Sequence, residues 1–412
     1  MSKKIIIGPF KQLLTMNKLP VKGALSDDEL EIIAAGGILI EGEKIVEVGD
    51  FSSLKEKWSD AAEVITLTDD YIALPGYVDC HTHIAFGGNR ANDFAMRNAG
   101  SSYLKIAEAG GGIWNTVRDT RGLSEEELAQ VTSLRADELL KQGITTIEVK
   151  SGYGLSVDEE LKTLRAIQKA SKDTNAELIS TCLAAHTFPK DFDGSPEEYL
   201  KEIMDRLFPI IKEEKLSNRV DAFVEQSAFS AEQTLPYFEL AKSMGFDITI
   251  HADQFSTSGS KLAVDLKAVS ADHLEASGEK EIAMLADSDV VAVALPAASL
   301  GIGCPFTPAR KLLDAGASLA IATDWNPGSA PMGMLVESAS ILATMDKLSN
   351  AEVLSAITFR AAHALNLKDR GRLVPGQLAD FVIYKTDNYQ NITYFQGGLK
   401  PQEVWKSGKK VV

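Results

Sequence analysis

Eight short runs of apolar and β-branched residues recur along the chain, and most are separated by segments with helical periodicity. The runs are Tyr77–His83, Thr145–Lys150, Glu177–His186, Val220–Glu225, Asp247–His251, Ala268–His273, Asp289–Leu295 and Ser318–Asp324. Strands that alternate with helices in this way indicate parallel β-α units. Eight such units predict an α/β fold built on a closed, TIM-like (β/α)8 barrel.

The two ends of the chain have a different pattern. Residues 1–75 contain alternating segments such as Gly37–Val48, which predicts two strands joined by a turn. After a predicted helix that ends near Leu367, similar patterning returns in Gly371–Tyr384. We therefore predict a small β-sandwich domain formed by both chain termini, with residues 1–75 and 369–412 flanking a barrel of residues 76–368.

Composition narrows the range of partners and compartments. The 412 residues include 58 acidic and 42 basic side chains, and the net charge of -16 argues against binding to nucleic acid or to anionic membranes. No apolar run is long enough to span a bilayer, and we expect no secretory signal, because the first residues lack an adequate apolar stretch and a small-residue cleavage site. Cys80, Cys182 and Cys304 form no CxxC pair, which is typical of buried, reduced thiols. We expect a cytoplasmic protein that acts on a small molecule.

Polar residues end nearly all of the predicted strands. In a (β/α)8 barrel the active site lies at the carboxyl ends of the strands, so these residues are candidates for chemistry. They include five of the six histidines in the chain. The residues at the strand ends are His81, His83, Lys150, His186, Glu225, His251, His273 and Asp324.

The pair His81 and His83 points to a metal site. Residues two apart on a strand face the same side, so both imidazoles aim into one space. With His251 and Asp324 they supply the nitrogen and oxygen donors of a catalytic, zinc-like centre that leaves one position for water. Asp324 is placed to accept a proton from that water, and His273 remains to polarise a carbonyl under attack.

Several segments around these residues resemble the amidohydrolase superfamily and, within it, the imidazolonepropionases. The similarity extends from about residue 37 to residue 385, and the 148–155 and 322–329 segments are the most particular to that family. The matching segments are Leu74–His83, Phe86–Arg90, Ala109–Ile113, Glu148–Leu155, Ala185–Thr187, Ile250–Gln254, Ala322–Ser329 and Gly371–Asp380.

The resemblance implies hydrolysis of the cyclic amide 4-imidazolone-5-propanoate to N-formimidoyl-L-glutamate, the third step of histidine degradation. It also implies one Zn²⁺ or Fe³⁺ ion per subunit, held by His81, His83, His251 and Asp324. The substrate contacts that it implies are Arg90, Tyr153, His186, Asn326, Gly328 and Ser329, with Tyr103 as a further contact. We expect a homodimer, because two-fold assemblies are the commonest among soluble enzymes.

The residue types agree with those roles. Arg90 lies in a glycine-rich loop after His83 and offers a planar guanidinium for bidentate pairing with a propanoate. Tyr153 lies between two glycines that allow the backbone to turn a phenol inward. The backbone N–H groups of Gly328 and Ser329 are candidates for a carboxylate cradle.

Gln254 departs from the pattern, because many relatives carry a carboxylate at this position. Glutamine orients an amide or a water molecule but carries no proton at neutral pH. We expect Gln254 to contact the substrate at the catalytic centre, while Asp324 or His273 moves the proton. Some relatives bridge two metal ions with a modified lysine after the fourth strand, but Glu225 stands there and Lys150 follows the second strand, which favours one ion.

Two alternatives remain open. A related mononuclear enzyme that deaminates a nucleobase-like ring uses the same four ligands, and release of ammonia distinguishes it; Arg90 argues against it. A non-catalytic, ligand-sensing barrel is the other, although none of the metal-binding or proton-transfer residues is missing. As a separate hypothesis, the glycine-rich segment 84–112 closes over bound substrate.

Overall fold

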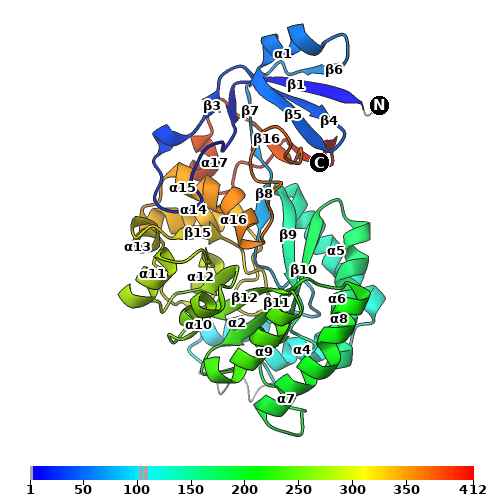
Figure 1. The fold of residues 1–412 in the computed structure, drawn as a ribbon, viewed down its shortest axis with the longest axis vertical. Coiled ribbons are helices and arrows are strands. Elements are labelled where there is room, and N and C mark those ends of the chain that lie inside the picture. The colour runs from blue at the N-terminus through cyan, green and yellow to red at the C-terminus, as the bar shows by residue number, and fades with distance from the viewer. Residues whose placement is uncertain (1–2, 102–104, 106–109) are drawn as a thin grey trace.

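The computed structural model describes all residues except 1–2, 102–104 and 106–109, and its centre is an eight-stranded parallel barrel (Figure 1). The strands follow one another in chain order around the sheet. They are β8 (Tyr77–Asp79), β9 (Ile144–Lys150), β10 (Glu177–Ala185), β11 (Arg219–Val224), β12 (Asp247–Ala252), β13 (Ser270–His273), β14 (Val291–Ala294) and β15 (Ser318–Ile321). The predicted (β/α)8 barrel is confirmed.

The barrel closes just beyond the ends of its first and last strands. Thr82 and Trp325 form a parallel β-bridge, and the Asp324 N–H donates to the His81 carbonyl at 2.9 Å. The His83 N–H donates to the Trp325 carbonyl at 3.0 Å. The same backbone contacts therefore close the barrel and bring three of the predicted metal ligands to one point on its rim.

Helices surround the barrel, and the chain marks several of their starts with serine. Ser124, Ser195, Ser230 and Ser349 are the N-caps of capping boxes, each with a Glu or Gln three residues later. The helices after β8 are α2 (Ala91–Asn98), α4 (Ile113–Arg121), α5 (Glu125–Lys141), α6 (Val157–Asp173), α7 (Pro196–Glu202), α8 (Phe208–Glu214), α9 (Ala231–Ser243), α10 (Gly259–Leu266), α11 (Glu279–Ala286), α12 (Pro296–Ile302), α13 (Ala309–Asp314), α14 (Leu335–Asp346), α15 (Asn350–Ala356) and α16 (Phe359–Ala364).

Between α7 and α8 the helix widens into a π-helical turn over Ile203–Leu207. Pro209, the second residue of α8, lacks an N–H donor, and its ring crowds the preceding turn. The Phe208 N–H donates instead to the carbonyl of Ile203, five residues back. The helix therefore continues from α7 to α8, with a local wide turn caused by proline.

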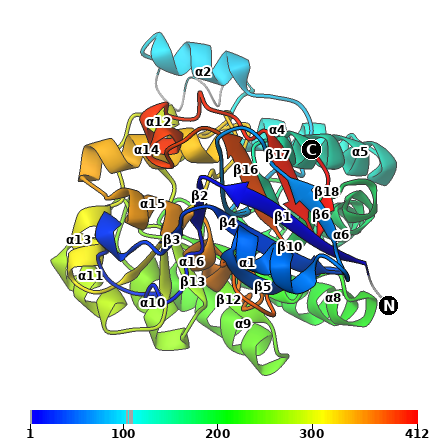
Figure 2. The ribbon, with the colours of Figure 1, turned by 90° about the horizontal axis from the view of Figure 1, so that it is seen from above.

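Two further sheets lie at one end of the molecule's long axis, and seen along that axis they lie in front of the barrel, with helices visible around them (Figures 1 and 2). A four-stranded sheet in the order β5-β4-β1-β6 comes from the N-terminal segment alone. A six-stranded sheet in the order β18-β17-β16-β7-β2-β3 combines both chain termini. Their strands are β1 (Lys4–Phe10), β2 (Gln12–Leu14), β3 (Ile32–Ile33), β4 (Gly36–Glu41), β5 (Lys44–Asp50), β6 (Glu63–Thr66), β7 (Tyr71–Pro75), β16 (Phe381–Lys385), β17 (Glu403–Lys406) and β18 (Lys409–Lys410).

The two sheets share one apolar core, as expected for a sandwich. Ile7 and Ile38 of the first sheet pack in the same cluster as Phe381 and Ile383 of the second. Helix α1 (Phe51–Trp58) covers the other face of the four-stranded sheet through Phe51 and its neighbours. Of the segment Gly371–Tyr384, only the part from Phe381 onward forms a strand, because the residues before it make turns.

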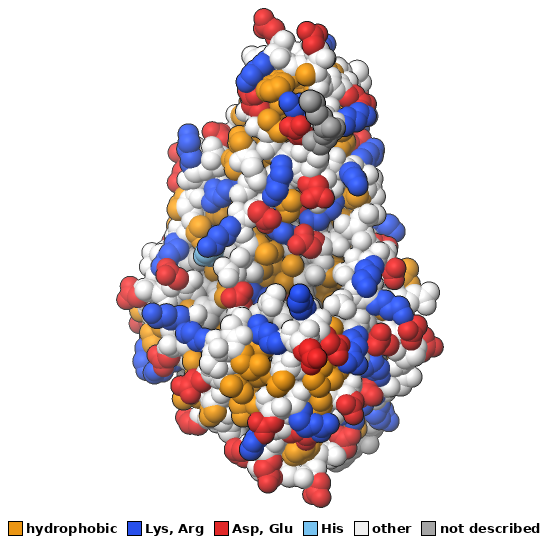
Figure 3. All heavy atoms as spheres, turned by 45° about the vertical axis from the view of Figure 1, so that its right-hand side comes forward, with side chains coloured by type: hydrophobic (Ala, Val, Ile, Leu, Met, Phe, Trp, Pro, Cys, Tyr) orange, Lys and Arg blue, Asp and Glu red, His pale blue; other side chains and the backbone are white. Residues whose placement is uncertain are grey.

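Charged side chains of both signs are interspersed over the face drawn in Figure 3, and no continuous basic patch covers it. Among the described residues, no helix is both long enough and apolar enough to cross a membrane.

Candidate metal centre and active site

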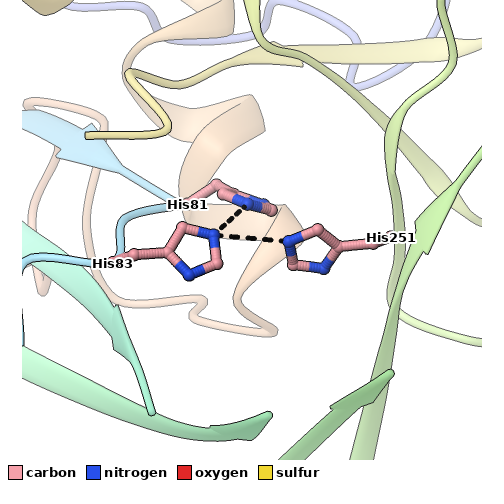
Figure 4. Close-up of side chains that lie close together, drawn as sticks. All are labelled: His81, His83 and His251. Carbon is pink, nitrogen blue, oxygen red and sulfur yellow. Dashed lines mark hydrogen bonds between the residues drawn. The ribbon is translucent and has the colours of Figure 1, made fainter. Parts of the chain in front are cut away.

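Three histidines converge at the carboxyl end of the barrel (Figure 4). His81 and His83 follow β8, and His251 lies in β12. The Nε2 atom of His83 lies 3.2 Å from Nε2 of His81 and 3.3 Å from Nε2 of His251. All three side chains are buried, and one nitrogen of each lies within 4.8 Å of the others. Their spacing suits three ligands of one ion.

The alternation predicted for His81 and His83 is present. The side chain of Cys80, between Asp79 and His81, packs in an apolar cluster with Val78, and the hydroxyl of Thr82 donates to the carbonyl of Glu148 at 2.5 Å. Cys80 and Thr82, which alternate with the two histidines, thus face away from them.

Asp324 adds an oxygen donor to the three histidines. It follows β15, the strand that closes the barrel next to β8. Its Oδ1 atom lies 3.5 Å from Nε2 of His81 and 3.3 Å from Nε2 of His83. Burial alone raises the pKa of this carboxyl, but the hydrogen bond from His83 and the nearby imidazoles bring the net pKa below its ordinary value. The backbone of Asp324 has φ +52°, a left-handed conformation that is strained for a residue with a Cβ and that recurs at functional sites.

Two buried carboxylates orient the histidine rings. Asp272 Oδ2 lies 2.6 Å from Nδ1 of His81, and Asp221 Oδ2 lies 2.8 Å from Nδ1 of His251. A carboxylate on Nδ1 fixes the ring and leaves Nε2 free to face a cation. Burial lowers the pKa of His251 to about 4 and lowers that of His81 well below its ordinary value. Neutral imidazoles with one carboxylate are a donor set that fits Zn²⁺ or iron.

Lys150 lies beneath this cluster and is fully buried. Its Nζ atom is 2.9 Å from Oε2 of Glu148, 2.9 Å from Oδ2 of Asp221 and 3.6 Å from Oδ2 of Asp272. One ammonium therefore supports both carboxylates that orient the histidines. Because Lys150 is held in these ion pairs, the arrangement favours the single-ion prediction.

A cavity of about 850 Å³ opens above the donors. Most of the predicted site residues line it, although they come from distant parts of the chain. Those residues are His83, Arg90, Tyr153, His186, His251, Gln254, His273, Asp324, Asn326, Gly328 and Ser329. His81 is not among the lining residues, and Tyr103 lies outside the described residues.

Arg90 is held at the start of α2 with its guanidinium toward the cavity. Its Nε atom donates to Oδ2 of Asp93 at 2.8 Å, and the same oxygen accepts the Gly112 N–H at 2.8 Å. The guanidinium lies against Gly328, since a Cβ built there would be 2.2 Å from Nη1 of Arg90. Two loops and one carboxylate thus fix this arginine.

His186 and Tyr153 pack beside the histidine cluster. The ring of His186 stacks on that of His83, with centroids 5.3 Å apart and planes 19° apart. The ring centroid of Tyr153 lies 5.3 Å from that of His186. The Nδ1 atom of His186 is 3.0 Å from the carbonyl of Gly152 and serves as the donor, which leaves Nε2 as an acceptor. Burial lowers the pKa of His186 well below its ordinary value, so the ring is neutral.

His273 ends β13 with a left-handed backbone at φ +84°. Its Nδ1 atom is 3.3 Å from Oε1 of Glu275, and Thr307 donates to its carbonyl at 2.5 Å. Burial lowers the pKa of His273, but the charge and hydrogen bond of Glu275 and the charges of Asp324 and Asp272 together outweigh that effect, so the net pKa is raised. The protonated ring that this favours is suited to polarising a carbonyl oxygen.

The carboxylate cradle predicted at Gly328 and Ser329 is wrong in its mechanism. Both N–H groups donate to the side-chain Oδ1 of Asn326, at 2.7 and 2.8 Å. An asparagine that folds back on the next residues in this way forms an Asx turn. What reaches the cavity is the side chain of Ser329, whose hydroxyl lies 3.4 Å from Oδ2 of Asp324, and the bare surface of Gly328.

The cavity wall also includes Glu225, Cys304 and Arg97, and of these only Glu225 was a candidate for chemistry, from its place at a strand end. Glu225 accepts the N–H groups of Phe255 and Ser256 at 2.9 and 3.0 Å, so it fixes the loop that carries Gln254. Cys304, expected to be buried, is only half-buried on this wall. Arg97 lies four residues after Asp93 in α2, so the two side chains share one face of the helix. The sequence shows this spacing only when the helix itself is known.

Comparisons with known proteins agree with this geometry. A model of the amidohydrolase family matches residues 72–411. The chain is 39% identical to the imidazolonepropionase of Bdellovibrio bacteriovorus, over 99% of this chain and 96% of that protein. It is 37% identical to the imidazolonepropionase of Fusobacterium nucleatum subsp. nucleatum, over 100% of this chain and 99% of that protein.

Solved structures with similar folds are more distant in sequence. A triazine hydrolase variant superposes with a TM-score of 0.78 at 19% identity, covering 99% of this chain and 94% of that one. An adenosine deaminase from Xanthomonas campestris with bound zinc gives 0.72 at 19% identity, covering 99% and 92%. At such identities the similarity concerns the fold alone.

Proposed function

The chain belongs to the amidohydrolase family, and we propose from this that it hydrolyses 4-imidazolone-5-propanoate to N-formimidoyl-L-glutamate in histidine degradation. The observation that carries the proposal is that one cavity lies over a cluster of donors spaced to hold a metal ion and has an arginine fixed at its rim. The donors suit hydrolysis of an amide, and the arginine suits the acid tail of this substrate.

We propose that His81, His83, His251 and Asp324 hold one Zn²⁺ or Fe³⁺ ion per subunit. Bound there, such an ion lowers the pKa of water and supplies a nucleophile near neutral pH. The support lies in the neutral imidazoles, in the carboxylates behind two of them and in the closeness of the four side chains.

The side chains around the donors divide the reaction between them. Asp324 accepts the proton of the attacking water as its oxygen bonds to the ring carbonyl carbon, and returns the proton to the ring nitrogen as the C–N bond breaks. His273 donates a hydrogen bond to the carbonyl oxygen, where negative charge develops. Gln254, which carries no proton, orients the ring or the water.

Arg90 pairs with the propanoate, and Gly328 leaves the space in which its guanidinium lies. Tyr153 and His186 contact the ring from the side of His83. Asn326 and Ser329 form the wall next to Asp324, where the carboxylate of the product appears. These roles place the acid tail near α2 and the ring over the donors.

The direct test is to purify the protein, measure its metal by elemental analysis and follow the loss of imidazolone absorbance. We expect about one metal ion per subunit, formation of N-formimidoyl-L-glutamate and no ammonia. Ammonia released from a nucleobase, with imidazolonepropanoate left intact, would instead identify a deaminase. A protein that binds metal and turns over neither substrate would support the non-catalytic alternative.

The choice between zinc and iron, the homodimer and the cytoplasmic location remain proposals. Elemental analysis, light scattering and cell fractionation test them respectively.

A further inference from the structure

Arg97 gives the cavity a second guanidinium beside that of Arg90, and it has no role in the reaction proposed above. Arg97 lies in α2 and lines the cavity together with Arg90, which precedes the helix. Asp93, between them in sequence, lies four residues before Arg97, a spacing that places side chains on the same face of a helix. Both arginines therefore approach the cavity from one short element.

The hydrogen bonds of the two arginines differ. Asp93 Oδ2 accepts the Nε–H of Arg90 and the N–H of Gly112, which engages this oxygen twice. Within the part of the chain that the structure describes, Nε and Nη2 of Arg97 are buried and have no hydrogen-bond partner. Buried donors without partners cost free energy, so an arginine in this state calls for an explanation, such as a ligand.

Charge around Arg97 points to the nature of that ligand. Burial lowers the pKa of Arg97, and the positive charge of Arg90 lowers it further, with Asp93 acting in the opposite direction. Two guanidinium groups that repel each other at one end of a cavity are stabilised by an anion. A carboxylate has about four acceptor positions, enough for hydrogen bonds from both arginines.

Resting on the proposed function, we infer that Arg97 and Arg90 together bind the propanoate carboxylate, and that Arg97 makes the site specific for ring substrates with an acid tail. The substrate has a single carboxylate, and the proposed function assigns the donor cluster to its ring. Asp93 is the positioning residue: it holds Arg90 by Nε and leaves the remaining N–H groups of both arginines for the ligand.

The test compares Arg97→Met and Arg97→Lys with wild type on imidazolonepropanoate. Because the carboxylate keeps its charge throughout the reaction, its contact contributes equally to substrate and transition state. We expect Arg97→Met to raise KM about 10- to 100-fold with kcat nearly unchanged, and Arg97→Lys to recover part of the loss. Arg118→Met, an exposed arginine of α4 that does not line the cavity, is the matched control.

Calorimetric binding of 3-(imidazol-4-yl)propanoate and of its amide separates charge recognition from general damage. Arg97→Met should weaken binding of the acid and leave binding of the amide as in wild type. An unchanged KM, a fall in kcat alone, or equal loss for acid and amide would overturn the inference while leaving the proposed function intact. A wild-type protein that neither turns over imidazolonepropanoate nor prefers the acid probe would overturn both.

Discussion

Because Gly328 has a hydrogen atom in place of a side chain, the guanidinium of Arg90 has room to lie against it. The space that a Cβ would occupy is filled by Nη1 of Arg90. Gly328 does not have a left-handed backbone, so its role is to leave room and not to make a turn. The sequence motif therefore has a physical reason that differs from the backbone cradle expected of it.

Gly328→Ala should displace Arg90 and weaken substrate binding. Because the displaced atom is the end of a flexible side chain, we expect little change in melting temperature but a KM higher by about 10-fold. Steady-state kinetics and thermal unfolding check this. Gly49→Ala, at a glycine where an added Cβ meets nothing within 4 Å, is the control, and an unchanged KM for Gly328→Ala would contradict the assigned position of Arg90.

In the proposed mechanism Asp324 has two roles, as a metal ligand and as a proton carrier. Asp324→Asn keeps the size of the side chain but removes its charge and its ability to accept a proton. We expect kcat to fall about 10²- to 10⁴-fold. Metal content measured on the same sample separates the two roles, since loss of activity with full metal content isolates proton transfer. Turnover close to wild type would refute this mechanism.

Among the elements, β9, β11 and β13 are joined by one buried ammonium. Lys150 of β9 pairs with Asp221 of β11 and lies near Asp272 of β13, and these two carboxylates contact His251 and His81. Burial of several charges is favourable only while they stay paired. Lys150 therefore supports the two carboxylates that orient two of the proposed metal ligands.

Lys150→Met should leave uncompensated carboxylates in the core. We expect a loss of about 3–5 kcal/mol in the free energy of unfolding, measured in urea, because the partners of a buried ion pair are left alone. We also expect metal affinity to fall about 10- to 100-fold, since the carboxylates behind the ligands lose their support. Competition with a chelator measures this without an activity assay.

Lys385→Met is the control for that experiment. Lys385 pairs with Asp69 at the surface, where both side chains are more than half exposed. Such pairs contribute about 0–1 kcal/mol. Wild-type metal affinity in Lys150→Met would show that the ion-pair cluster has no part in holding the donors.

For the whole molecule, the β-sandwich meets the barrel at the end opposite the cavity. Glu177, the first residue of β10, accepts from Arg370 at 2.6 Å and from Lys406 of β17 at 3.0 Å. Lys406 also donates to the buried Asp380 at 2.7 Å. In a barrel of this type, contacts at the amino ends of the strands serve stability, while the carboxyl ends carry chemistry.

Lys406→Met should therefore reduce stability and spare catalysis. We expect a loss of about 3 kcal/mol in unfolding free energy, because Asp380 keeps its burial and loses its counter-charge. The folded enzyme should retain the wild-type kcat/KM. A large change in kcat/KM of the folded variant would mean that this end of the barrel is coupled to the cavity.

At acid pH, the free energy of unfolding of Lys406→Met should differ less from that of wild type than it does at pH 7. Burial raises the pKa of Glu177, but Arg370 and Lys406 lower it more, so the net pKa lies below its ordinary 4.5. A carboxyl with a lowered folded-state pKa stabilises the protein above its unfolded pKa, and that stability is lost as pH falls through the folded-state value. Urea unfolding at pH 7 and below pH 4.5 should show a smaller deficit in acid.

Local pattern was enough to predict the barrel and the donors. Runs of β-branched residues that alternate with amphipathic helices define parallel β-α units, and a parallel barrel brings all carboxyl ends to one rim. His81, His83, His251 and Asp324 were therefore predictable as neighbours although 243 residues separate the first from the last. The spacing of His81 and His83 also fixed their common face, because side chains alternate along a strand.

Only the tertiary structure decided which groups pair with one another. Asp272 and Asp221 stand behind His81 and His251, and Asn326 takes the N–H groups of Gly328 and Ser329. Among the described residues, Arg97 has buried donors without partners beside the cavity. All of these depend on distances between elements. Sequence periodicity states which face a side chain is on, whereas the packing of helices and loops sets what lies opposite it.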